Sequence, residues 1–302
     1  MTRPVALLAD AGAPAALLAY LVAIAVAAAL GGAAPVLLSL GHRRMQVLLS
    51  LTGGVMLGVG LLHLLPHGHG LLGGDIETTM PWVLGGFLAM FLLERAFHGH
   101  AHHATDGSHD AECEHHAAHS HSPSGGVPSR WSWVGALVGL SLHSLADGAA
   151  LAAAVDAGGT DGGLVGFATF LAIAIHKPID ACVITTLLLK AKATANTRRL
   201  VTAGYALVVP IGALVFLASV RLFGGANAGV TGAALALAAG AFLCIAAADL
   251  LPEVEFHSHD RLLLTASLAA GLLIAVAVTA IERASPAHAA HAHARESHDH
   301  DH

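Results

Sequence analysis

Eight long apolar stretches alternate with short polar ones along this chain of 302 residues. An apolar stretch of roughly 17–25 residues is long enough to cross the hydrocarbon core of a bilayer as an α-helix. The chain is only 11% charged, whereas a soluble domain carries about 25% charged residues. We therefore expect an all-α integral membrane protein with eight transmembrane helices, and not a soluble helical protein with a large apolar core. The expected helices cover residues 15–40, 46–67, 81–97, 131–155, 162–189, 200–222, 228–252 and 261–281.

Basic residues gather in alternate connections between these stretches. They are Arg43, Arg44, Arg95, Arg130, Lys190, Lys192, Arg198, Arg199 and Arg261. The opposite connections are acidic or neutral, with Arg221 as the exception. Because cytoplasmic connections are rich in Lys and Arg, we expect both termini outside, in the periplasm of a bacterial inner membrane. The N-terminus lacks the basic region and cleavage site of a signal peptide, so the first helix is expected to be retained.

Two segments are rich in histidine and cannot bury a core. Residues 98–126 join the third and fourth apolar stretches, and residues 287–302 form a tail. Both are expected to be disordered without a ligand. Clustered imidazoles with interleaved carboxylates indicate binding of a divalent cation such as Zn²⁺; a merely solvating tract is the alternative. The candidate loop ligands are His98, His100, His102, His103, His109, His115, His116, His119 and His121.

The fourth and fifth apolar stretches each carry a His-x-x-x-Asp pair. His143 and Asp147 lie in SLHSLADGAAL, and His176 and Asp180 lie in IHKPIDA. Residues four apart share one helix face, and an ionisable group at membrane depth costs about 2.5–3.5 kcal/mol on insertion scales. Two imidazoles and two carboxylates from adjacent helices therefore predict a four-ligand site, in which the aspartates balance one divalent cation. The alternative is two structural His–Asp hydrogen bonds.

Pro178 stands between the two ligands of the fifth stretch. Proline lacks an amide N–H and crowds the carbonyl four residues earlier, here that of Ala174. Irregular backbone at membrane depth is tolerated where it lines a cavity. We therefore expect a kink in this helix beside the site.

Two similar motifs end the second and seventh stretches. HLLPH carries His63 and His67, and DLLPE carries Asp249 and Glu253. The two helices are expected to run in opposite directions, so the motifs predict an inverted repeat of the 3+2+3 type. The histidines would lie at the outer mouth of a pathway, and the acids, with Glu255, His257 and His259, at the inner mouth. Interfacial caps and snorkelling side chains are the alternative.

These features divide the chain into five parts, with the metal site in the central one. They are helices one to three (1–97), the His-rich loop (98–130), helices four and five (131–190), helices six to eight (191–283) and the His-rich tail (284–302).

The combination resembles the ZIP (Zrt/Irt-like) zinc and iron permeases over nearly the whole chain. HLLPH resembles the end of helix two in the LIV-type branch of that family. HSLADG, beginning at His143, resembles the pattern His-Asn-x-Pro-Glu-Gly of helix four. HKPID, beginning at His176, resembles helix five, and AFLCIAAADLLPE resembles helix seven. The resemblance implies eight spans, outward termini and a His-rich cytoplasmic loop.

The chain departs from the family pattern at a second metal position. Family members often bind two adjacent ions, the second through the Asn of helix four, an acid of helix five and an acid of helix six. Here Ser144 and Lys177 replace the first two ligands, and residues 200–222 contain no acid. One central ion is therefore expected. Lys177 would pair with the aspartates, unless it snorkels to the cytoplasmic face.

We interpret the chain as a transporter that moves Zn²⁺ into the cytoplasm, with Fe²⁺, Mn²⁺, Co²⁺ and Cd²⁺ as other possible substrates. The resemblance implies a homodimer in the lipid bilayer, in which helices one, four, five and six move against the rest; no nucleic-acid partner is expected. Two alternatives remain open. One is a metal-dependent intramembrane hydrolase, in which an aspartate activates water. The other is a metal exporter or buffer, for which the His-rich loop would collect ions.

Overall fold

A computed structural model of the chain describes residues 12–37, 42–97, 132–157, 166–222, 228–256 and 261–284. All regular secondary structure in these ranges is helical. The ranges contain eight candidate membrane spans, which confirms the predicted fold class and number of spans. The helices are α1 (Gly12–Leu37), α2 (His42–Val59), the π-helix η1 (Gly60–Leu64), α3 (Leu65–Leu71), α4 (Ile76–Phe97), α5 (Ser132–Ala157), α6 (Phe167–Lys190), α7 (Ala195–Ala206), α8 (Val208–Leu222), α9 (Ala228–Phe256) and α10 (Arg261–Ala284).

The second span is a continuous rod made of α2, η1 and α3. In η1 the amide of Leu65 bonds to the carbonyl of Gly60, five residues earlier. Pro66 follows, and in a regular α-helix its ring would crowd the carbonyl of Leu62. The wider π-turn accommodates this proline. The span therefore continues to Leu71, beyond its predicted end at residue 67.

The third span begins earlier than predicted because Asp75 caps it. The Asp75 carboxylate accepts hydrogen bonds from the amides of Glu77 and Thr78, each 3.1 Å long. A hydrogen bond from the Thr78 hydroxyl and these amide bonds lower the pKa of the Asp75 carboxyl. The ionised carboxylate stabilises the positive end of the helix dipole. Consequently α4 starts at Ile76, and the predicted start at residue 81 was wrong.

The sixth span is made of two helices and not one. Thr194 caps α7 by accepting a 3.2 Å hydrogen bond from the amide of Thr197, so the span starts at Ala195 and not at residue 200. The break at Leu207 separates α7 from α8. It precedes Pro210, which lacks the amide that would continue an α-helical ladder.

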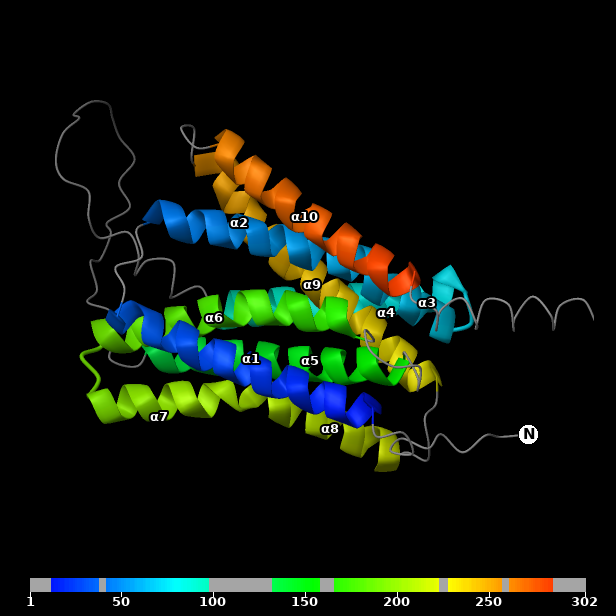
Figure 1. Cartoon of the computed structure of the whole chain (residues 1–302), viewed down its shortest axis with the longest axis horizontal. Helices are drawn as coiled ribbons and strands as arrows, with labels where there is room; N and C mark the ends of the chain where they lie inside the picture. The colour runs from blue at the N-terminus through cyan, green and yellow to red at the C-terminus, as the bar shows by residue number, and fades with distance from the viewer. Residues whose placement is uncertain are drawn as a thin grey trace, which may run out of the picture.

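Four pairs of helices lie side by side along the bundle: α1 with α6, α2 with α10, α4 with α9, and α5 with α8 (Figure 1). Glycines allow the closest approaches. Gly148 of α5 contacts the backbone of Val209 in α8, and Gly212 of α8 contacts the backbone of Leu145 in α5; a Cβ atom at either glycine would overlap that backbone. Such small-residue packing is typical of membrane helices. The 3+2+3 inverted repeat stays a prediction.

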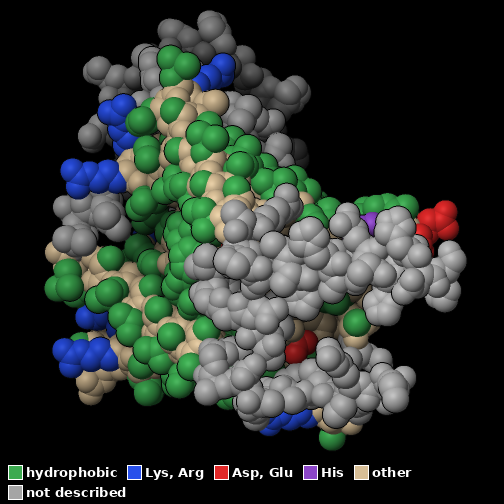
Figure 2. Space-filling view, turned by 45° about the vertical axis from the view of Figure 1, so that its right-hand side comes forward, with side chains coloured by type: hydrophobic (Ala, Val, Ile, Leu, Met, Phe, Trp, Pro, Cys, Tyr) green, Lys and Arg blue, Asp and Glu red, His purple; other side chains and the backbone are tan. Residues whose placement is uncertain are grey.

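The surface of the bundle fits contact with lipid. Large apolar side chains remain exposed, among them Leu30, Leu262 and Leu273, and hydrophobic side chains make up most of the coloured part of the face in Figure 2. Most of the visible Lys and Arg side chains lie toward the left and upper margins of that view. The start of α1 and the end of α10 lie at the same end of the bundle (Figure 1).

Candidate metal site

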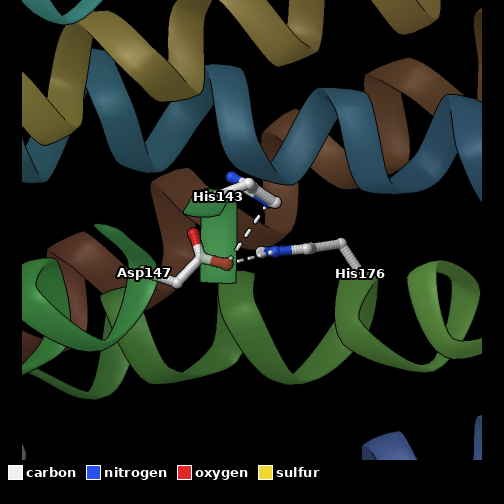
Figure 3. Close-up of side chains that lie close together, drawn as sticks. All are labelled: His143, Asp147 and His176. Carbon is white, nitrogen blue, oxygen red and sulfur yellow. Dashed lines mark hydrogen bonds and ion pairs between the residues drawn. The ribbon is translucent and has the colours of Figure 1, made fainter. Parts of the chain in front are cut away.

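The predicted His–Asp pairs meet where α5 and α6 pack together. His143 and Asp147 come from α5 and His176 comes from α6, and Figure 3 shows the three side chains pointing toward one another. One ligand atom from each residue lies within 4.8 Å of the other two. None of the three side chains is more than 5% exposed. The i,i+4 spacing places the α5 residues on one face, as the sequence predicted.

One oxygen of Asp147 is the centre of the arrangement. Its Oδ2 lies 3.3 Å from Nε2 of His143 and 3.2 Å from Nε2 of His176. Nζ of Lys177 is 2.5 Å from the same oxygen. A buried carboxylate needs such partners, because desolvation strongly disfavours an unpaired charge.

The two imidazole rings are held differently. Nδ1 of His176 lies 2.8 Å from the carbonyl oxygen of Ala172. Only an N–H can donate to a carbonyl, so this nitrogen carries the proton, and in the neutral ring Nε2 offers its lone pair to the site. A metal-binding histidine is commonly oriented in this way. Nδ1 of His143 is buried and has no hydrogen-bond partner in the described part of the chain.

Lys177 belongs to the same cluster. Its side chain is 1% exposed, and its ammonium also lies 3.2 Å from Oδ2 of Asp180. The ammonium is therefore shared by two carboxylates inside the bundle. The alternative of a lysine that snorkels to the cytoplasmic face was wrong, because α6 places this residue toward α5 and not toward the surface.

Asp180 lies farther from the centre than predicted. Its Oδ2 is 3.9 Å from Nε2 of His143, and its side chain is 17% exposed. This oxygen accepts a 3.1 Å hydrogen bond from the hydroxyl of Tyr205. Asp180 is thus near the other three residues, but Lys177 and Tyr205 hold it to one side.

Sequence reasoning missed Tyr205. This residue lies at the end of α7, two positions before the break at Leu207. Its hydroxyl accepts a 3.0 Å hydrogen bond from Ser144, whose Oγ also contacts the Leu140 carbonyl at 2.6 Å. The ammonium of Lys177 lies 5.8 Å from the centre of its ring. The signal was available, because the chain has only two tyrosines and this one interrupts an apolar stretch.

Neighbouring helices enclose the site. The ring of Phe242, from α9, lies edge-on to His176 with 6.4 Å between ring centres. Gly31 of α1 packs against the backbone of Pro178 so closely that a Cβ atom there would overlap it. Helix α6 continues through this proline to Lys190, and the predicted kink stays a prediction.

The predicted outer histidines are placed at the end of the bundle where α1 begins. His63 lies in η1 and is buried, with Nδ1 2.9 Å from Oε2 of Glu282 in α10. The His67 ring is 4.6 Å from that of His63, between ring centres, and its Nδ1 lies 2.8 Å from the His63 carbonyl oxygen. Sequence reasoning missed Glu282, although an acid near the end of an apolar helix was a signal.

The other predicted ligands are not described in the same detail. Asp249, Glu253 and Glu255 lie within α9, but their side chains are outside the described structure. His257, His259, the loop histidines of residues 98–121 and the tail also lie outside the described residues. Their roles, and the five-part division of the chain, stay predictions.

Comparison with known proteins gives a consistent result. The profile of a family described as "ZIP Zinc transporter" matches residues 15–132 and 100–281. "Zinc transporter ZIP9" of Micropogonias undulatus is 26% identical over 286 residues, which cover 80% of this chain and 85% of that protein. "Zinc transporter ZIP9-B" of Xenopus laevis is 31% identical over 202 residues, covering 65% of this chain and 58% of the relative. "Zinc transporter ZIP9" of Xenopus tropicalis is 30% identical, also over 58% of its length.

Proposed function

Because this chain belongs to the ZIP zinc transporter family, we propose that it moves Zn²⁺ across a membrane into the cytoplasm through one central site. His143, Asp147, His176 and Asp180 are its proposed ligands. Members of this family are transporters and not enzymes, so the hydrolase alternative is not retained.

The convergence of buried ligands from two helices carries this proposal. Ligand atoms of His143, Asp147 and His176 lie within 4.8 Å of one another, and Asp180 reaches to within 3.9 Å of His143. Two imidazole nitrogens and two carboxylates form a donor set suited to Zn²⁺. The same donors suit Fe²⁺, Mn²⁺, Co²⁺ and Cd²⁺, which we include as further candidate substrates.

Charge balance favours a single ion in this site. Asp147 and Asp180 supply two negative charges, which one divalent cation neutralises. Lys177 already shares both carboxylates, and its protonated amine has no lone pair to offer. A second ion beside it would therefore be repelled. An ion bound at Oδ2 of Asp147 would displace the ammonium from that oxygen, and an ammonium that stays beside Asp180 would still repel a second ion.

The remaining predicted ligands would form a path on either side of this site. His63 and His67 would receive ions outside, and Asp249, Glu253, Glu255, His257 and His259 would pass them to the His-rich loop inside. With this order, we propose that both termini lie in the periplasm, on the outer side of a bacterial inner membrane. We further propose a homodimer; export or buffering of zinc is the alternative to import.

Uptake by oriented membrane vesicles tests the proposed function. Asp147→Asn keeps the size of the side chain but removes its charge, so accumulation of radioactive zinc should fall at least about tenfold. Asp156→Asn is the matched control in α5, because its amide oxygen retains the 2.8 Å hydrogen bond from Thr231. Normal uptake by a correctly inserted Asp147→Asn protein would contradict the proposed site, and efflux from the cytoplasmic side would indicate an exporter.

The number of central ions is a separate prediction. An anomalous-diffraction map of crystals grown with Zn²⁺ should show one peak among His143, Asp147 and His176. Two peaks about 4 Å apart, the separation of a two-metal site, would contradict the explanation given for Lys177.

A further inference from the structure

A second group of buried polar side chains lies at the end of the bundle where α1 begins. His63 comes from η1, Glu282 from α10, and the first turn of α6 approaches both. Nδ1 of His63 is 2.9 Å from Oε2 of Glu282, and the side chains are 7% and 10% exposed. The other oxygen of Glu282, Oε1, accepts a 3.0 Å hydrogen bond from the amide of Ala168.

Several buried polar atoms in this part of the bundle lack hydrogen-bond partners. Five buried side-chain atoms in the described residues have none. Two of them, His63 Nδ1 and Glu282 Oε2, form the contact described above, and two others are Thr169 Oγ1 and Thr279 Oγ1. Thr169 follows Ala168 in α6, and Thr279 lies one turn before Glu282 in α10. The His63–Glu282 contact is close but does not have hydrogen-bond geometry. Leaving a buried polar atom unpaired costs about 1–3 kcal/mol, so a ligand for these atoms is expected.

We propose that His63 and Glu282 form a second divalent-cation site, which binds Zn²⁺ before it reaches the central site. An imidazole nitrogen and a carboxylate oxygen that converge without a shared hydrogen bond can both donate lone pairs to such an ion. Thr279, one turn before Glu282, and Thr169, next to Ala168, each have a buried hydroxyl without a hydrogen-bond partner in the described residues, and we propose them as further oxygen donors. This inference rests on the proposed function, because it treats zinc as the ion that enters.

Glu282 is suited to this task because its two oxygens have different partners. Oε1 is bound to the α6 amide, where the positive end of the helix dipole stabilises a carboxylate. Oε2 is left for the ion. The carboxylate is therefore held in place before a cation arrives, and cation binding does not require the hydrogen bond to Ala168 to break.

The proposed site is separate from the central one and is connected to the surface. Ala168 and His176 are eight residues apart in α6, about 12 Å along the helix axis. His67 is only partly buried, and its ring contacts that of His63. In this proposal His67 would pass an ion from the surface to His63 and Glu282 before it reaches the central site.

Crystals of the full chain grown with Zn²⁺ and measured at the zinc absorption edge test this inference. We expect an anomalous peak within about 2.0–2.2 Å of His63 Nδ1 and Glu282 Oε2, the usual zinc–ligand distance. Glu282→Gln should remove this peak and leave the central one. It retains an oxygen for the Ala168 amide, so the protein should fold. Glu77→Gln, an exposed acid at the start of α4, is the matched control and should retain both peaks.

Each result has a distinct meaning. A central peak without one at His63 and Glu282, at saturating zinc, overturns this inference and leaves the proposed function intact. A peak at His63 and Glu282 without a central peak supports the inference and counts against the proposed central site. Absence of both peaks overturns both proposals.

Transport kinetics test whether this site precedes the central one. Glu282→Gln should raise KM for zinc uptake about tenfold or more while kcat changes by less than about twofold. The substitution weakens zinc binding at His63 and Glu282 but leaves transfer through the central site unchanged. Glu77→Gln should change neither constant. An unchanged KM for Glu282→Gln would overturn the place of this site on the path.

Discussion

At the residue scale, Lys177 is the side chain that most affects how the central site works. Its ammonium lies between Asp147 and Asp180 and supplies the positive charge that a bound metal ion would otherwise supply. The same contacts stabilise the buried carboxylate of Asp147 and the partly buried carboxylate of Asp180. The lysine therefore supports the fold and competes with the ion that the site is proposed to carry.

Replacing this lysine should separate the two effects. In Lys177→Met the protein should bind Zn²⁺ at least about tenfold more tightly, because zinc no longer has to displace the ammonium. A tenfold change in affinity corresponds to about 1.4 kcal/mol. Its melting temperature without zinc should fall, since two carboxylates lose a partner, and added zinc should raise it more than in the parent. Chelator competition and thermal melts measure both quantities.

Lys190→Met provides the control, because Lys190 is an exposed residue at the end of the same helix. It should change neither the affinity nor the effect of zinc on melting. Weaker zinc binding by Lys177→Met than by the parent would mean that the lysine supports the loaded site and does not compete with the ion.

At the element scale, glycines set how closely the helices around the site approach. Gly148 directly follows the ligand Asp147 and packs against the backbone of Val209 in α8. A methyl group there must push α5 and α8 apart. Because the preceding residue is a ligand, the displacement should also disturb the central site.

Two glycines of α5 allow a matched test of this packing. Gly148→Ala should lower the melting temperature and reduce zinc uptake, since backbone atoms cannot move aside as a flexible side chain can. Gly135→Ala adds the same methyl group where nothing lies within 4 Å, so it should leave stability equal or slightly higher. Equal effects of both substitutions would contradict the packing explanation. Circular dichroism melts and vesicle uptake provide the measurements.

At the scale of the whole molecule, the central site is enclosed by helices that come from both halves of the chain. Ligands come from α5 and α6, Gly31 of α1 covers Pro178, and Phe242 of α9 covers His176. The residues named in this enclosure all lie in the described helices, and none comes from the His-rich segments. Capture of metal and passage through the bundle should therefore be separable functions.

Deletion of residues 98–124 tests that separation. The deleted protein should still take up zinc at saturating concentration, because the proposed ligands in α5 and α6 are unchanged. Uptake at low zinc, or its regulation, should differ, and titration should show the loss of several weak sites. Complete loss of uptake by a well-folded deletion protein would place the loop on the transport path.

Much of the fold and part of the site could be predicted from the amino-acid sequence alone. Eight apolar stretches are long enough to cross a bilayer, and each is expected to be a helix. In lipid the backbone N–H and C=O groups must be hydrogen-bonded within the segment, which a helix achieves. The i,i+4 spacing determines that His143 and Asp147 share a face, because helix geometry depends on local bonds alone. The sequence also identified Lys177 as unusual, from its charge in an apolar stretch.

Other features depended on contacts between residues far apart in the chain. Tyr205 reaches Asp180, and Glu282 reaches His63 and the start of α6; no local periodicity relates residues separated by 25 to more than 200 positions. Only packing decided that Lys177 faces the carboxylates and not the surface, because the sequence of α6 alone does not determine which of its faces is turned toward α5. The hydrophobic pattern determined which segments lie in the membrane, whereas close helix packing decided which of their few polar groups meet.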